Sequence, residues 1–122
     1  MRLIDHYIAG AAAAVPTARW GEVFDPNSGE VQAHVPLGAV ADLDRAVAAA
    51  RAAQPGWAAT NPQRRARVLF RFKELVEAEM DTLAHLLSSE HGKVIADSKG
   101  DIQRGLDVVE FACGVPHLLK GE

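Results

Sequence analysis

Residues 30–50 read EVQAHVPLGAVADLDRAVAAA, and the spacing of the apolar residues changes inside this stretch. From Glu30 to Pro36 apolar and polar residues alternate, which is the period of a half-buried strand. From Val40 onward the apolar residues recur at helical spacing and occupy one face of a helix. The stretch therefore predicts that an extended amino-terminal part ends near residue 38 and that helices follow it.

The amino-terminal part, residues 1–38, is expected to form two or three short antiparallel strands in a meander. Two other extended runs, residues 7–9 and 22–24, are each followed by residues that favour turns. Pro36 has no backbone donor, so it is expected to end the last strand. The alanine run at residues 11–14 lies between a glycine and a proline, and we expect a loop there.

The remainder, residues 39–122, is expected to contain about four helices. Pro55 and Gly56 are predicted to stop the first helix, because proline disrupts a helix interior. Asn61 is a good N-cap and Pro62 is tolerated in the first helical turn, so a second helix is predicted to begin there. Its predicted apolar stripe consists of Val68, Phe72, Leu75, Val76 and Met80.

The third and fourth helices are predicted from their ends and from one apolar face. Asp81 is a candidate N-cap for the third helix, and Gly92 is a candidate stop in the left-handed conformation. The fourth helix is expected to begin after Ala96. Its apolar face has spacings of four, three and four residues and consists of Ile102, Leu106, Val109 and Cys113.

Composition narrows the classes of function. The 122 residues are 48% hydrophobic and 24% charged, which suits one ordered domain or part of a larger one. A formal charge of −3 argues against nucleic-acid binding and against a polybasic membrane anchor. The single cysteine forms no intrachain disulfide and fits a reducing compartment. No run approaches the length of a membrane span and no basic region opens the chain, so we expect no signal peptide and a cytoplasmic location.

Few residues carry recognisable chemistry by themselves. The five histidines are scattered without a helical pair, so no metal site is expected. Zinc-protease, calcium-loop, nucleotide-loop and serine-hydrolase motifs do not occur in the sequence. Asp107 and Glu110 are three residues apart on a predicted helix, and we expect both to face solvent rather than to form an acid–base pair.

Three features leave two interpretations open. Cys113 is either a thiolate nucleophile or a small buried hydrophobic residue, and its place late on an apolar helix face favours burial. The cluster of Arg64, Arg65 and Arg67 is either an anion site or a solvated face. Arg104 lies beside the apolar face next to a glycine, where its guanidinium either holds a carboxylate bidentately or forms a structural ion pair.

Several segments resemble the aldehyde dehydrogenase superfamily. The similarity is carried by residues 24–31, 46–53 with Trp57, 67–69, and the sequence Glu90-His91-Gly92-Lys93. Residues 91–122 resemble more specifically the coenzyme-A-acylating branch of that superfamily, which acts on semialdehyde acids. The resemblance covers almost the whole chain, except for residues 11–19.

The resemblance implies that these residues are one part of a longer enzyme. Family members are several times longer, and this segment resembles the amino-terminal part of their Rossmann-like coenzyme-binding domain. We therefore expect residues 1–122 to form an α+β fragment that has no catalytic or cofactor-binding residue of its own and is inactive. Cys113 does not align with the family nucleophile. Arg104 matches an arginine that contacts the substrate carboxylate together with a second arginine outside this segment.

The parent enzyme implied by the resemblance uses NAD and coenzyme A. It would oxidise a semialdehyde acid, release carbon dioxide and form propionyl- or acetyl-coenzyme A. We expect it to be a homo-oligomer, either a dimer or a tetramer, with no nucleic-acid or membrane partner. Two alternatives remain at this point: a non-catalytic helical binding module, and an aldehyde dehydrogenase that acts on another aldehyde.

Overall fold

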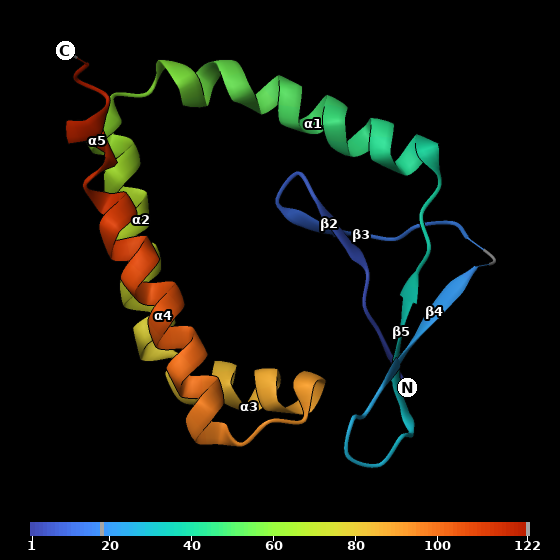
Figure 1. The fold of residues 1–122 in the computed structure, drawn as a ribbon. Coiled ribbons are helices and arrows are strands. Elements are labelled where there is room, and N and C mark those ends of the chain that lie inside the picture. Colours follow the sequence, from blue (N-terminus) through green and yellow to red (C-terminus); the bar gives the residue numbers. More distant parts are fainter. Residues whose placement is uncertain (18, 122) are drawn as a thin grey trace. The chain divides into compact units, whose positions relative to one another are not determined.

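The computed structural model describes residues 1–17 and 19–121 and shows an α+β arrangement (Figure 1). It divides into two compact units, Met1–Ala58 and Ala59–Glu122. In the described residues the strands lie in the first unit, and the helix α1 (Val40–Ala59) follows them. The other helices lie in the second unit. The predicted fold class, short strands followed by helices, is therefore confirmed.

A three-stranded sheet forms the first part of the amino-terminal unit. Its central strand is β5 (Val31–Pro36), which lies between β1 (Arg2–Leu3) and β4 (Trp20–Phe24). The predicted alternating strand and its end at Pro36 are confirmed, and Ala33 in its middle is fully buried. β4 pairs with β5 in antiparallel orientation, but β1 runs parallel to β5, which the expectation of antiparallel strands did not include.

The turn between β4 and β5 follows from its residue types. Asp25 accepts hydrogen bonds through Oδ1 from the amides of Asn27 at 2.8 Å and Ser28 at 3.4 Å. An aspartate bonded to its own following backbone in this way mimics a backbone turn. Gly29 has a φ of 75°, a left-handed conformation that glycine adopts without strain. The predicted turn is therefore present, and it fixes how β4 meets β5.

A second, two-stranded sheet corrects the expected loop at residues 11–14. β2 (His6–Ile8) pairs with β3 (Ala11–Ala13) in antiparallel orientation. The two residues between these strands, Ala9 and Gly10, have φ values of 56° and 82°. Positive φ at both positions is the geometry that matches the twist of a two-residue hairpin. Strand pairing in β3 is made by backbone groups. Three alanines can therefore form this strand although alanine does not favour strands.

The predicted end of the first helix at Pro55 and Gly56 is wrong, because α1 continues through both residues to Ala59. An interior proline removes one backbone hydrogen bond and costs a helix about 3 kcal/mol. The preceding residues of α1 are rich in alanine, which has the best helix propensity, and this compensates for part of that cost. A single proline therefore did not end the helix.

Residues 59–121, the described part of the second unit, contain four helices: α2 (Pro62–Ala78), α3 (Met80–His91), α4 (Ile95–Cys113) and the single turn α5 (Val115–Leu118). α4 runs back along α2 and also packs against α3 (Figure 1). α4 begins one residue earlier than Ala96. The buried side chains are small apart from Leu106 and include Ala66, Ala84, Ser98 and Cys113.

The helix ends test three predictions. Asn61 caps α2, because its side-chain oxygen accepts a hydrogen bond from the amide of Gln63 at 2.9 Å. Gly92 ends α3 with a φ of 83°, so the predicted left-handed stop is confirmed. The predicted N-cap at Asp81 is wrong, since α3 already begins at the preceding residue. Only Glu79 separates α2 from α3, which leaves no room for a separate capping turn.

The two predicted apolar faces have different surroundings. On α4, Leu106 is 2% exposed and Cys113 is 7% exposed, as expected for a packed face. On α2, Val68, Phe72 and Leu75 are each about half exposed. Val76 and Met80 are half-buried, so among the described residues the α2 stripe is open to solvent at Val68, Phe72 and Leu75.

Candidate functional site

Arg104, the one residue predicted to contact a substrate, lies in the middle of α4. Its guanidinium pairs through Nη2 with Oδ1 of Asp101, one helical turn earlier. The Arg104 side chain is nevertheless 72% exposed. Arg104 therefore forms the structural ion pair that was one interpretation of the sequence. Its side chain is also exposed enough to bind a carboxylate, which was the other interpretation.

Asp101 also pairs with a second cation. Lys93, in the connection between α3 and α4, places its Nζ against Oδ2 of the same carboxylate. The side chains of Lys93 and Asp101 are 19% and 36% exposed, so the cluster becomes more open toward Arg104. We refer to Lys93, Asp101 and Arg104 as the carboxylate-bridged cluster. It has two positive charges and one negative charge.

The electrostatics of the cluster follow from these two pairs. The hydrogen bond from Lys93 holds the pKa of Asp101 below its ordinary value, and the hydrogen bond from Arg104 lowers it further. Burial acts in the opposite direction on this pKa, but it does not prevail. Asp101 is therefore ionised at neutral pH and accepts hydrogen bonds through both oxygens.

The packing of α3 against α4 positions the cluster. The left-handed turn at Gly92 reverses the chain directly before Lys93. The hydroxyls of Ser88 on α3 and Ser98 on α4 are hydrogen-bonded at 2.7 Å, and Ser98 is completely buried. Lys99 adds an ion pair at 2.5 Å to Asp81, and this contact lowers the pKa of that carboxyl. Asp101 and Arg104 therefore lie on α4 and Lys93 lies in the connection before it, and α3 and α4 are linked to each other close to the cluster.

The chemistry available to the cluster is binding rather than bond making. A guanidinium has N–H donors on three nitrogens, and Asp101 engages only Nη2 of Arg104. The remaining N–H groups are free to donate hydrogen bonds to a second carboxylate. The sequence could have indicated the Asp101–Arg104 pair, because residues three apart on a helix are neighbours. The contribution of Lys93 was missed, since it depends on the turn at Gly92.

The other predicted candidates are distributed over the second unit. Cys113 is buried and lines a recess with Arg67 and His117, which agrees with its interpretation as a small core residue. Arg64 and Arg65 lie in the first turns of α2 with Arg67, and the Nε of Arg65 is buried without a hydrogen-bond partner among the described residues. In the part of the chain that the structure describes, the ion pairs of the carboxylate-bridged cluster do not include these arginines.

Asp107 and Glu110 each have a partner of their own. Asp107 accepts a hydrogen bond from Gln103 at 3.0 Å. Glu110 pairs with Lys73 of α2 at 3.4 Å, and Lys73 also contacts Glu77 at 2.5 Å. The hydrogen bond to Glu77 raises the pKa of Lys73. Both carboxylates are exposed, as expected. Asp107 accepts a hydrogen bond on the surface, and Glu110 forms a surface ion pair.

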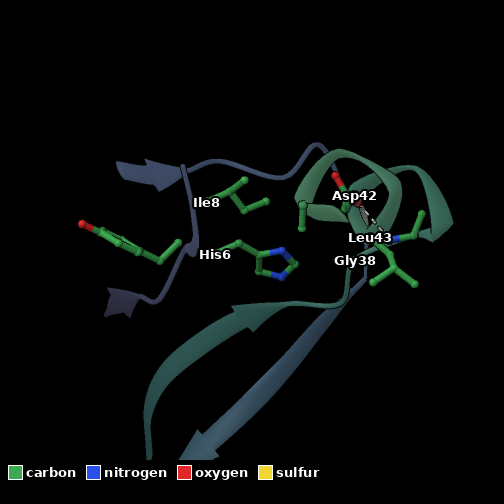
Figure 2. Close-up of a pocket in the computed structure, with 8 residues that line it drawn as sticks. His6, Ile8, Gly38, Asp42 and Leu43 are labelled. Carbon is green, nitrogen blue, oxygen red and sulfur yellow. Dashed lines mark hydrogen bonds between the residues drawn. The ribbon is translucent and has the colours of Figure 1, made fainter. Parts of the chain in front are cut away.

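A pocket in the first unit was not anticipated from the sequence. Figure 2 shows His6 and Ile8 from β2 facing Gly38, which precedes α1, and Asp42 and Leu43 in the first turn of α1. The polar groups there already have partners, since His6 Nε2 donates to the carbonyl of Pro36 at 3.2 Å. Asp42 Oδ2 accepts from the amide of Ala39 at 2.9 Å. A side chain at position 38 would place its Cβ 2.8 Å from the His6 ring, so the ring would have to move to make room for it.

The described residues contain neither a metal-binding cluster nor a membrane-spanning helix. Within residues 1–17 and 19–121, no group of three or more His, Cys, Asp or Glu side chains is placed to hold a metal ion. Over the same residues, no helix has the length and apolar character required to cross a membrane.

Comparison with known proteins gives one consistent family. Residues 15–122 match the aldehyde dehydrogenase family. A malonate-semialdehyde dehydrogenase of Pseudomonas aeruginosa is 42% identical over 117 residues, which cover 96% of this chain and 24% of that protein. A malonate-semialdehyde dehydrogenase of Bacillus pumilus is 39% identical over the whole chain and 25% of the relative.

Solved structures agree with these relatives. A Sinorhizobium meliloti protein, described as a methylmalonate-semialdehyde dehydrogenase and complexed with NAD, superimposes with a TM-score of 0.97 and 53% identity. The methylmalonate-semialdehyde dehydrogenase of Oceanimonas doudoroffii superimposes with a TM-score of 0.95 and 43% identity. Each superposition covers all of this chain and 25% of the other. The chain thus spans about a quarter of the length of these relatives.

Proposed function

Because this chain belongs to the aldehyde dehydrogenase family, we propose that it is part of a NAD-dependent, coenzyme-A-acylating (methyl)malonate-semialdehyde dehydrogenase. The observation that carries the proposal is the superposition on the Sinorhizobium meliloti protein, with a TM-score of 0.97 and 53% identity over the whole chain. The names of the Pseudomonas and Oceanimonas relatives support the same substrate class. The resemblance of residues 91–122 to the acylating branch points in the same direction.

The reaction assigned to the parent enzyme divides between this segment and the rest of the protein. Oxidation of the semialdehyde, acyl transfer to coenzyme A and loss of carbon dioxide would depend on residues outside residues 1–122. We expect no nucleophile, NAD site or coenzyme A site within this segment, and we expect the segment alone to be inactive. Cys113 is buried on α4 and is assigned no catalytic role.

Within this segment, Arg104 is proposed to hold the carboxylate of the semialdehyde acid. Three observations support this role: its guanidinium is 72% exposed, it has donors that Asp101 does not engage, and the cluster retains one net positive charge. Binding the substrate carboxylate orients the aldehyde end toward the catalytic residues, and such orientation is a large source of rate enhancement. A second arginine from the remainder of the protein would complete the contact.

Three coarser expectations accompany this function. Residues 1–122 would be the amino-terminal part of the coenzyme-binding domain. The whole enzyme would be a homo-oligomer, either a dimer or a tetramer. It would act in the cytoplasm, and the single cysteine within residues 1–122, which forms no disulfide there, agrees with a reducing compartment.

The test compares two substrates in the full-length enzyme. Arg104→Leu should lower kcat/KM for malonate semialdehyde by about a hundredfold, since hydrogen bonds to charged groups contribute about 1.5–3 kcal/mol each. Turnover of propanal, which has no carboxylate, should not change. Arg71→Leu is the matched control, because Arg71 pairs with Glu74 at the same i,i+3 spacing and is 67% exposed. Unchanged turnover of the semialdehyde acid by Arg104→Leu would refute the role.

A further inference from the structure

Asp101 has no assigned role, yet it makes both ion pairs of the carboxylate-bridged cluster. We propose that Asp101 is the positioning residue of this site: it orients the Arg104 guanidinium toward the substrate carboxylate, while Lys93 neutralises the charge of Asp101. The inference rests on the proposed role of Arg104 and adds to it how that arginine is held and why it keeps its positive charge.

The Arg104 side chain is long and flexible. A long side chain that is 72% exposed samples many rotamers unless a partner restricts it. Asp101 supplies that restriction by holding Nη2 from the preceding turn of the same helix. The guanidinium is planar and joined to the helix by its own side chain, so holding one nitrogen restricts the directions in which its other donors can point. A carboxylate that arrives would then meet an arginine whose orientation is already set, and less entropy would be lost on binding.

The net charge of the carboxylate-bridged cluster depends on Lys93. A carboxylate paired with Arg104 alone would leave a neutral pair, which has little attraction for an anionic substrate. Lys93 engages the other oxygen of Asp101, so the three charges sum to one positive charge. Lys93 is the least exposed member of the cluster and Arg104 is the most exposed, at 19% and 72%. The uncompensated charge is therefore presented at the open end of the cluster, where a monocarboxylate can reach it.

The backbone around Asp101 and Lys93 is held by neighbouring contacts. Asp101 lies one turn after Ser98, which is completely buried and hydrogen-bonded to Ser88 of α3. Lys93 directly follows Gly92, whose left-handed conformation ends α3. Asp101 therefore lies on a packed helix, and Lys93 lies in the three-residue connection between α3 and α4, two helices that pack against each other. A positioning residue needs such support, because a displacement of about 1 Å can remove much of its effect.

The experiment uses the full-length enzyme with malonate semialdehyde and propanal as substrates. Asp101→Asn should raise KM for malonate semialdehyde about tenfold and leave propanal turnover unchanged. Asp101→Glu keeps the charge at the same helical position and should restore most of the loss. Lys93→Met should raise KM for the semialdehyde acid several-fold, because the cluster then becomes neutral. Asp107→Asn is the matched control, since it removes one exposed charge further along α4, and both substrates should be unaffected.

A double-mutant cycle separates this inference from the proposed function. In the Arg104→Leu background, Asp101→Asn should have no further effect, because there is no guanidinium left to orient. If Arg104→Leu impairs turnover of the semialdehyde acid but Asp101→Asn does not, the positioning role is wrong and the role of Arg104 stands. If Arg104→Leu has no effect, both are overturned. An equal loss for the two substrates in Asp101→Asn, or a lower KM for the semialdehyde acid, would also overturn the positioning role.

Discussion

Replacing Leu106 by alanine tests how the second unit is held together. Leu106 lies on α4 and is 2% exposed, the largest side chain among the buried residues described. The substitution removes three carbon groups, and each buried carbon group contributes about 0.8 kcal/mol. The transfer of these groups therefore accounts for about 2.4 kcal/mol, and the cavity that remains adds to it. We expect a total loss of about 3 kcal/mol in the free energy of unfolding, within the range measured for buried leucines.

The control is the same substitution at Leu119, whose side chain is 60% exposed after α5. Only about two-fifths of the transfer effect applies there, so we expect a loss of about 1 kcal/mol. The assay is urea unfolding of the 122-residue chain, followed by the helical circular dichroism signal. With a slope of about 1 kcal/mol per molar urea, Leu106→Ala should lower the midpoint by about 3 M, or leave the unit unfolded in water. Equal shifts for the two variants would refute the assignment of Leu106 to the core.

Three further outcomes are expected. Asn61→Ala should lower the free energy of unfolding by about 1 kcal/mol while Asn61→Asp preserves it, as measured by urea unfolding, and equal values would contradict the cap. Lys93→Met should raise the pKa of Asp101 more than Arg104→Met does, because the hydrogen bond from Lys93 lowers that pKa most. An NMR titration of the Asp101 carboxyl measures both changes, and a larger rise in Arg104→Met would contradict this order. Because that pKa is lowered in the fold, the ion pairs stabilise above about pH 4 and are lost as the pH falls through the lowered value. The exposed α2 stripe should cause concentration-dependent self-association, and a monomer at all concentrations in sedimentation would contradict this.

Local signals in the sequence were enough for the elements whose causes are local. The alternation before Pro36 predicted β5, and the pair Asn61–Pro62 predicted the start of α2. Gly92 predicted the end of α3, because only a residue tolerant of positive φ suits that position. In each case the residue type that predicts the boundary of the helix or strand is also the residue that forms this boundary in the structure.

The errors occurred where the deciding contact is not encoded in the residue type. The strand β3 consists of alanines that pair through their backbone, so nothing in its composition distinguished it from a loop. Pro55 is a helix-stopping residue type, but the alanine-rich helix α1 continues through it. Asp81 is a good capping residue, yet the start of α3 is set by the short connection to α2.

The candidate site was predictable in part. Arg104 was selected from its place beside the apolar face and from resemblance, and its neighbour Asp101 could be derived from helical spacing. The second cation could not, because Lys93 precedes α4 and reaches Asp101 only through the turn at Gly92. Likewise, the solvent exposure of the α2 stripe depends on which side of α2 faces α4, and amphipathic spacing alone does not determine that choice.

The parallel pairing of β1 has a consequence for the order in which the first sheet assembles. Arg2 pairs with Ala33 and Leu3 with His34, so this pairing closes a loop of about thirty residues. β4 and β5 are joined by a short turn and pair with a much smaller loss of chain entropy. We therefore expect the β4–β5 hairpin to form first and β1 to join it late. Amides of β1 should exchange hydrogen fastest within this sheet, and changes at the amino terminus should release β1 without separating β4 from β5.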